Sequence, residues 1–137
     1  FMGFTGLVPR EHSSGNSSWR GSITKAGNSH LRRVLVEAAW SARHRPAIGP
    51  EHRKRCEGQP PEVLAYCWAA QLRLNAKFHV LRATKSRNTA VIAVARELAG
   101  FVWGLMNDKI TVNSNRRGRR SARASIPEEI LEDTTPV

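Results

Sequence analysis

Apolar residues recur at the three-to-four-residue spacing of an amphipathic helix in three stretches of the chain. The first stretch covers about residues 29–45, the second residues 61–81 and the third residues 88–106. In the first, the predicted buried face consists of Leu31, Leu35, Ala38 and Ala42. The pattern therefore predicts a mainly α protein, built as a small helical bundle.

Residues typical of helix ends border these stretches. Asn28 or Ser29 is a suitable N-cap for the first helix. Pro61 suits the first turn of the second helix. The later part of that helix carries a cationic side, formed by Arg73, Lys77, Arg82 and Lys85. In the third helix we expect Arg96 and Glu97 to lie on an exposed flank.

The remaining segments lack strong periodicity. The apolar character of residues 1–9 predicts the end of a helix or a buried extended segment. The serine and glycine content of residues 10–27 predicts an irregular loop, which can carry a short hairpin around Trp19. Residues 46–60 predict a basic connection, and residues 109–137 a disordered tail that is first basic and then acidic.

Charge narrows the class of partner. The chain carries 22 Lys and Arg against 11 Asp and Glu, which gives a net charge of +11 and a pI near 11.2. This excess favours a polyanionic partner, with nucleic acid as the first choice, over a basic surface that serves solubility alone.

No apolar run reaches the roughly 18 residues of a membrane span, and the first residues lack the order of a secretory signal. We expect an intracellular protein without a membrane partner.

Several chemistries have little support in the residues. Two cysteines, Cys56 and Cys67, cannot form a disulfide framework, and no CxxC pair predicts zinc. Neither a P-loop nor a dinucleotide-binding fingerprint occurs. Two-metal nucleases need several converging carboxylates, whereas the acids before residue 109 are scattered singly. The sequence predicts no cofactor and no metal in this chain.

Residues 13–33 hold the densest possible chemistry. Two adjacent serines, Ser13 and Ser14, precede Gly15, and His12 stands beside them. A serine nucleophile needs an exposed hydroxyl, a proton acceptor, and cations for the charge of the transition state. The cations near in sequence are Arg10, Arg20, Lys25, Arg32 and Arg33. Serine beside glycine is also ordinary loop chemistry, so the pattern alone leaves both interpretations open.

Three blocks of the sequence carry a resemblance to a known family. They are GLVPREHSSG (residues 6–15), GSITKAGNSHLRRVL (residues 21–35) and AVARELAGFVW (residues 93–103). The first two closely resemble the C-terminal transposase domain of the IS110/IS116/IS902 insertion-sequence family, and the third resembles that family's final helix. The resemblance covers about residues 3–107.

This resemblance implies DNA transposition. In the family, an N-terminal RuvC-like domain with an acidic DEDD set binds Mg²⁺, and the C-terminal domain supplies a serine that forms a phosphoserine link to DNA. A structured bridge RNA pairs with target and donor DNA. The resemblance also implies that the intact protein is a homo-oligomer. It would act in the prokaryotic cytoplasm, at the nucleoid. By motif position the nucleophile is the serine before the glycine, which leaves Ser14 and Ser13 as the candidates.

The resemblance also implies what part of the enzyme this is. Residues 1–108 would be a partial, N-terminally truncated transposase domain that binds nucleic acid and is inactive without the RuvC-like half, where Mg²⁺ belongs. Gly15, Gly21 and Gly27 would permit close backbone approach. The expected nucleic-acid contacts are Arg20, Lys25, Asn28, Arg32, Arg33, Arg53, Lys54 and Arg55.

An alternative belongs to another class. The chain would be a non-catalytic helical nucleic-acid-binding module, either a transposase remnant or a regulator similar to helix-turn-helix proteins. The helix from Ser29, which follows a Gly27-Asn28 turn, would then enter the DNA groove. The target and guide sequences stay open.

Overall fold

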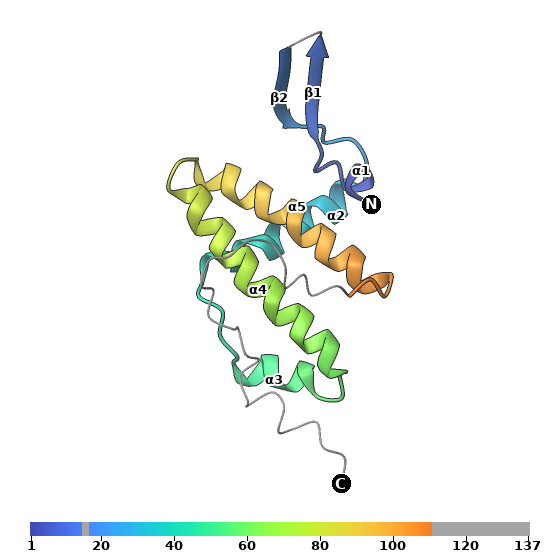
Figure 1. Ribbon diagram of the computed structural model, residues 1–137, viewed down its shortest axis with the longest axis vertical. Coiled ribbons are helices and arrows are strands. Elements are labelled where there is room, and N and C mark those ends of the chain that lie inside the picture. The colour runs from blue at the N-terminus through green and yellow to red at the C-terminus, as the bar shows by residue number, and fades with distance from the viewer. Residues whose placement is uncertain (15–16, 111–137) are drawn as a thin grey trace.

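The computed structural model describes residues 1–14 and 17–110, with only the backbone course for residues 12–13 and 17–20 (Figure 1). From residue 111 on, the predicted tail lies outside the described residues. The elements are, in order, α1 (Met2–Thr5), β1 (Pro9–Ser14), β2 (Ser17–Ile23), α2 (Ser29–Ala39), the 3₁₀ turn η1 (Trp40–Arg43), α3 (Pro50–Cys56), α4 (Pro61–Arg82) and α5 (Arg87–Met106).

The three predicted helices are confirmed, and two of them, α2 and α5, have a side-chain N-cap. Asn28 caps α2, because its Oδ1 accepts a hydrogen bond from the N–H of Leu31 at 2.9 Å. The second helix, α4, begins at Pro61. Ser86 caps α5 and accepts from the N–H of Thr89 at 3.2 Å. These caps satisfy donors that the first helical turn leaves without a partner.

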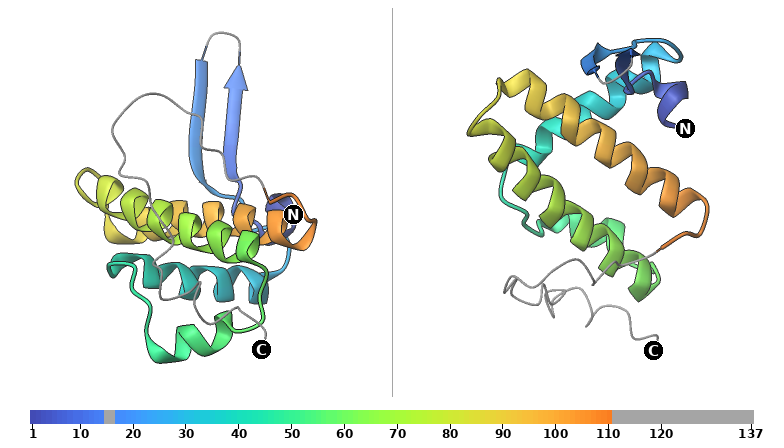
Figure 2. Two further views of the ribbon diagram at one scale, coloured as in Figure 1. Left: turned by 60° about the horizontal axis from the view of Figure 1, so that its bottom comes forward. Right: turned by 45° about the horizontal axis from the view of Figure 1, so that its top comes forward.

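The core lies among three helices. Helices α4 and α5 run side by side as a helical hairpin, and α2 packs across the other side of α5 (Figures 1 and 2). This arrangement confirms the mainly α bundle. The buried apolar side chains that join these elements are Leu7, Leu35, Ala39, Leu74, Phe78, Ala90, Val91, Val94, Ala95 and Ala99.

The buried face of α2 differs from the predicted face by one position. Ala38 is exposed, whereas Ala39 is 1% exposed and belongs to the core. Leu35 and Ala39 are four residues apart and form the row that meets α5. Because alanine is compatible with either side of a helix, only the packing against α5 could decide between the two.

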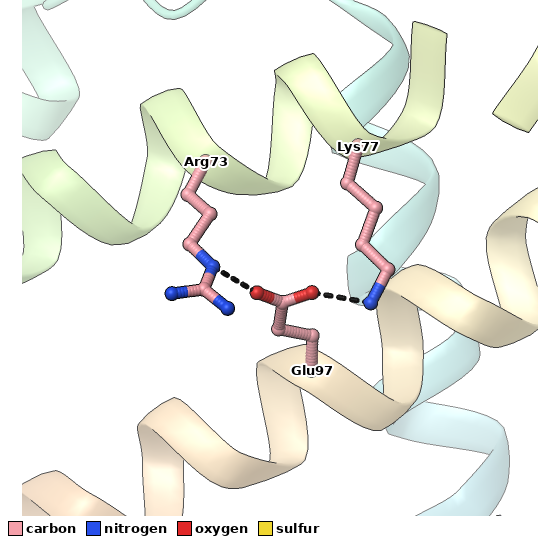
Figure 3. Close-up of polar contacts among 3 residues, drawn as sticks. All are labelled: Arg73, Lys77 and Glu97. Carbon is pink, nitrogen blue, oxygen red and sulfur yellow. Dashed lines mark hydrogen bonds and ion pairs between the residues drawn. The ribbon is translucent and has the colours of Figure 1, made fainter. Parts of the chain in front are cut away.

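The predicted exposure of Glu97 is wrong. Its side chain is 13% exposed and accepts hydrogen bonds from Arg73 and Lys77 across the α4–α5 interface (Figure 3). The closeness of the two helices brings these three side chains together. The predicted cationic side of α4 is thereby partly neutralised.

The segment predicted as an irregular loop that can carry a short hairpin around Trp19 is largely a β-hairpin. Strands β1 and β2 pair antiparallel, with an irregularity between Pro9 and Glu11. The connection falls between Ser14 and Ser17, and Trp19 lies within β2. The hairpin stands out from the helices (Figures 1 and 2). Of its residues, Ile23 at the base packs against the core.

The predicted basic connection contains a helix that its sequence did not reveal. Helix α3 occupies Pro50–Cys56, and proline at its start favours the helical conformation. None of its residues is buried. A seven-residue helix with no buried face produces no apolar periodicity, so this element was missed.

Helix α5 corrects the expectation about membrane spans. By length and composition it could cross a membrane, with a mean hydropathy of 1.5 over its most apolar window. Its Val91, Val94 and Ala95 are nevertheless buried against neighbouring helices. A helix in the centre of a small bundle is apolar on several sides for this reason.

Two backbone segments, residues 3–6 and 24–28, meet below the hairpin, and we call this contact the glycine clamp. Gly6 has a φ of 66° and Gly27 a φ of 94°, values that favour glycine. A Cβ placed on Gly27 would lie 2.2 Å from the carbonyl oxygen of Phe4, and one placed on Gly6 would lie 2.0 Å from a facing carbonyl oxygen. The clamp therefore has room only for glycine at both positions.

Backbone hydrogen bonds close the clamp. The N–H of Asn28 donates to the carbonyl of Phe4 at 2.8 Å, and the N–H of Lys25 donates to the carbonyl of Gly6 at 3.1 Å. Beneath them, Thr5 is fully buried, and its hydroxyl donates to the carbonyl of Met2 at 2.8 Å. These bonds fix the base of the hairpin to the start of α2.

We predict that Gly27→Ala destabilises the protein by about 2–5 kcal/mol, because a left-handed conformation is costly for alanine and the clash must move the backbone. The free energy of unfolding in urea measures the loss. Gly49→Ala is the matched control, since no atom lies within 4 Å of a Cβ placed at Gly49. Equal stability of the two variants would contradict the clamp.

Candidate functional site

The serine pair lies at the outer end of the hairpin. In the strand register, Ser13 is opposite Ser18 and Ser14 is opposite Ser17. Ser14 is the last residue of β1 and is exposed. Its position beside the connection leaves it accessible to a large substrate.

The register also separates the two serines. Successive residues of a strand belong to opposite faces, and residues paired across the ladder share a face. Since His12 is paired with Trp19, residues 12, 14, 17 and 19 share one face of the hairpin. Residues 11, 13, 18 and 20 share the other, where Glu11 is paired with Arg20. Ser14 thus shares a face with His12, and Ser13 shares one with Arg20.

Arg32 joins the start of α2 to the glycine clamp. Its Nη1 donates to the carbonyl of Thr5 at 3.2 Å and to the carbonyl of Lys25 at 3.0 Å. Lys25 itself adopts a φ of 58°, which turns its carbonyl toward the guanidinium. Arg32 therefore supports the base of the hairpin, a role that its position in the sequence did not indicate.

The other predicted contact residues fall into separate places. Asn28 caps α2, and exposed Arg33 lies 3.6 Å from the carboxylate of Glu37 on the same helix. The predicted cluster of Arg53, Lys54 and Arg55 lies on α3, at the opposite end of the molecule from the hairpin (Figure 1). The structure brings Lys25, Asn28 and Arg32 together at the hairpin base and leaves the α3 cluster apart.

A cleft beside α3 groups basic residues that the sequence analysis did not single out. It has a volume of about 580 Å³ and lies among the segment after η1, α3 and α4. Arg55 of the predicted cluster lines it together with His44, Arg45 and His52. Only the tertiary structure could reveal this grouping, because the residues belong to different elements.

Other possible nucleophiles in the described residues have no sign of activation. The hydroxyl of Tyr66 donates to the carbonyl of Phe101 at 3.2 Å, and burial, then repulsion from the Cys67 thiolate, raises its pKa. Burial, followed by repulsion from Cys56, also raises the pKa of the Cys67 thiol. Both groups are therefore held in their protonated, weakly nucleophilic forms at neutral pH.

The carboxylates of the described residues do not form a magnesium site. Within residues 1–14 and 17–110, no group of three or more His, Cys, Asp or Glu side chains could hold a metal ion. Glu97 is occupied by two cations, and Glu51 lies 3.9 Å from Lys54. The donor set in the described part of the chain does not fit Mg²⁺.

Comparison with known proteins gives the family. Residues 1–56 match the family model described as Transposase IS116/IS110/IS902 family. By sequence, the matched part of the chain, residues 1–56, belongs to this transposase family. The matched residues contain α1, the hairpin, the glycine clamp, α2 and α3.

Two curated relatives extend the likeness. A Sinorhizobium fredii protein named as a transposase, y4qE, is 46% identical over 108 residues, which are 78% of this chain and 28% of the relative. A Pseudomonas aeruginosa protein named as a family 20 transposase is 32% identical over 94 residues, which are 65% of this chain and 26% of the relative. The chain thus spans little more than a quarter of these transposases. No solved structure matches it.

We predict that alanine substitutions at two adjacent arginines lower the free energy of unfolding by different amounts. Arg32→Ala should lower the free energy of unfolding by about 1.5–3 kcal/mol, because it removes charged hydrogen bonds to two carbonyls. Arg33→Ala, the matched control, should cost less than about 0.5 kcal/mol, because its ion pair is exposed. Urea unfolding of the two variants measures the difference. Similar losses would show that Arg32 does not support the clamp.

Proposed function

We propose that this chain is the part of an insertion-sequence transposase that binds DNA and supplies a serine nucleophile for strand transfer. The observation that carries the proposal is the serine pair at the exposed end of an anchored hairpin, within the residues that match the family. The protein acts in the cytoplasm, on DNA of the nucleoid.

Ser14 is the preferred nucleophile and Ser13 the alternative. Ser14 is exposed and shares a hairpin face with His12, a residue type that accepts protons near neutral pH. Residues two apart on a strand have Cα atoms about 7 Å apart. The imidazole side chain would bridge this separation, directly or through one water, to act as the general base for the hydroxyl. Ser13 lacks this neighbour on its own face but shares that face with Arg20.

The proposed step is attack on a DNA phosphodiester. The serine oxygen forms a bond to phosphorus, its proton passes to the base, and one bond from phosphorus to a deoxyribose oxygen breaks. The departing sugar oxygen takes a proton, and a phosphoserine link remains. Cations bear the added negative charge on phosphorus, and Arg20 is the nearest in the register to Ser13. Exposed Lys25 would contact a phosphate farther along the strand.

Metal-dependent steps belong elsewhere in this proposal. Since the carboxylates described above do not fit Mg²⁺, the acidic RuvC-like set of the family would have to come from outside the described residues. A guide RNA and a homo-oligomeric assembly are likewise proposed for the complete transposase. The chain by itself would bind nucleic acid without recombining it.

The non-catalytic module has weaker support. In that module α2 would be the recognition helix. However, the N-terminal part of α2 carries Arg32, whose side chain is hydrogen-bonded within the glycine clamp. Arg33, on the exposed side, is paired with Glu37. A helix that reads a DNA groove needs free polar side chains near its N-terminus. The hairpin is therefore the better candidate for the contact with the reacting DNA.

We predict that Ser14→Ala in the intact transposase abolishes a covalent protein–DNA adduct, a loss of at least about 10³-fold. Labelled DNA that stays with the denatured protein on a gel measures the adduct. Ser22→Ala is the matched control, because Ser22 is an exposed serine of the same hairpin near its base. It should leave adduct formation unchanged.

Ser13→Ala decides between the neighbours. If Ser13→Ala alone removes the adduct, the nucleophile is Ser13 and the assignment by hairpin face is wrong. If adduct and recombination persist in the double alanine variant, the serine mechanism fails. DNA binding by that variant would then favour the non-catalytic module.

A further inference from the structure

A shallow pocket at the corner between α4 and α5 is lined mainly by basic side chains. It has a volume of about 490 Å³ and is lined by Arg43, Phe78, His79, Arg82, Ala83 and Arg87. No carboxylate is among these lining residues. Three guanidinium groups and an imidazole, contributed by three elements, thus surround one hollow.

The arginines of this corner lack acidic partners in the described part of the chain. Arg82 and Arg87 are exposed and take part in no ion pair or side-chain hydrogen bond there. Arg43 uses only its Nε, which donates to Nε2 of His44 at 2.8 Å. By contrast, Arg73 on the same α4 is paired with Glu97 (Figure 3). Within the described residues, the positive charge of this corner therefore has no acidic partner.

The helix dipoles explain only part of this grouping. His79 and Arg82 lie in the last turn of α4, where a cation is favourable. Arg87 is the first residue of α5, where the dipole is positive and a cation is unfavourable. The same end carries no acidic residue in its first turn. An anion in the pocket would compensate both the dipole and the converging guanidinium groups.

The floor of the pocket strengthens such an interaction. Phe78 is 4% exposed and contacts the ring of His79 edge-on, with centroids 5.5 Å apart. An apolar floor keeps water away from one side of a bound anion, which makes the attraction to the arginines stronger. Guanidinium groups bind phosphate oxygens in pairs, a geometry that lysine lacks.

We propose that this corner, Arg43, His79, Arg82 and Arg87, binds a phosphodiester of a nucleic-acid backbone away from the serine hairpin. The inference rests on the nucleic-acid binding of the proposed function but not on the serine chemistry. Three arginines and a net charge of +11 favour phosphodiesters over the carboxylates of an acidic protein. The corner would hold DNA or RNA while the hairpin engages the reacting strand.

The test compares Arg82→Gln/Arg87→Gln with Lys85→Gln/Lys109→Gln in the 137-residue chain. Both variants lose two positive charges from exposed positions, but only the first pair lines the pocket. Fluorescence anisotropy at several salt concentrations measures binding to a 20-base-pair DNA duplex, a single-stranded RNA of equal charge, and an oligoglutamate of equal charge. Circular dichroism checks the fold of each variant.

We expect the pocket variant to bind at least one nucleic acid about tenfold more weakly at about 0.1 M salt, with a salt slope smaller by about 1.8. The lysine variant should lose much less. Arg82→Lys/Arg87→Lys should restore most of the slope, because it restores the charges. If the pocket variant loses more affinity for one of the two nucleic acids, that nucleic acid is the source of the phosphodiester. Equal losses of affinity for DNA and RNA indicate a contact that does not distinguish deoxyribose from ribose.

Three results would overturn the inference. Equal losses in the pocket and lysine variants would mean that only net charge matters. Oligoglutamate that binds as tightly as nucleic acid, and depends equally on Arg82 and Arg87, would make the ligand an acidic peptide. If the wild-type chain binds none of the polymers, nucleic-acid binding in the proposed function fails as well, which distinguishes that outcome from the first.

Discussion

The close approach of two backbone segments at Gly6 and Gly27 is the constraint on which the serine hairpin depends. A two-stranded hairpin is marginally stable in water and has no core of its own. Here the carbonyl of Phe4 accepts from Asn28, the cap of α2, so the hairpin base and the bundle share one set of hydrogen bonds. Arg32 adds two further bonds to the same place. The orientation of the serines relative to the helices follows from this contact.

The positive charge of the protein is divided by the positions of its few carboxylates. Glu97 neutralises two cations of α4, and Glu37 lies beside Arg33. The corner lined by Arg82 and Arg87 has no carboxylate among its lining residues. Net charge alone predicts affinity for polyanions, whereas this division among the described residues is what leads us to propose a phosphate site at that corner.

The family match places the hairpin, the clamp and α2 in one recognised segment, while α4 and α5 supply most of the core beyond residue 56. The bundle can therefore be understood as the support of the hairpin. Its helices fix α2, and α2 fixes the clamp through Asn28 and Arg32. The match to the transposase family lies in residues 1–56, and the serine chemistry is our proposal.

The three main helices follow from local sequence, because apolar spacing and the residues Asn28 and Pro61 act over a few neighbouring positions. The residues also identify the serine segment and its resemblance to the family. The sequence favours a hairpin only around Trp19 and does not predict α3, because none of the residues of α3 is buried and no apolar period results. Nor could it separate Arg32 from Arg33, or gather Arg43 with Arg82. Those distinctions depend on contacts between residues far apart in the chain, which only the tertiary structure decides.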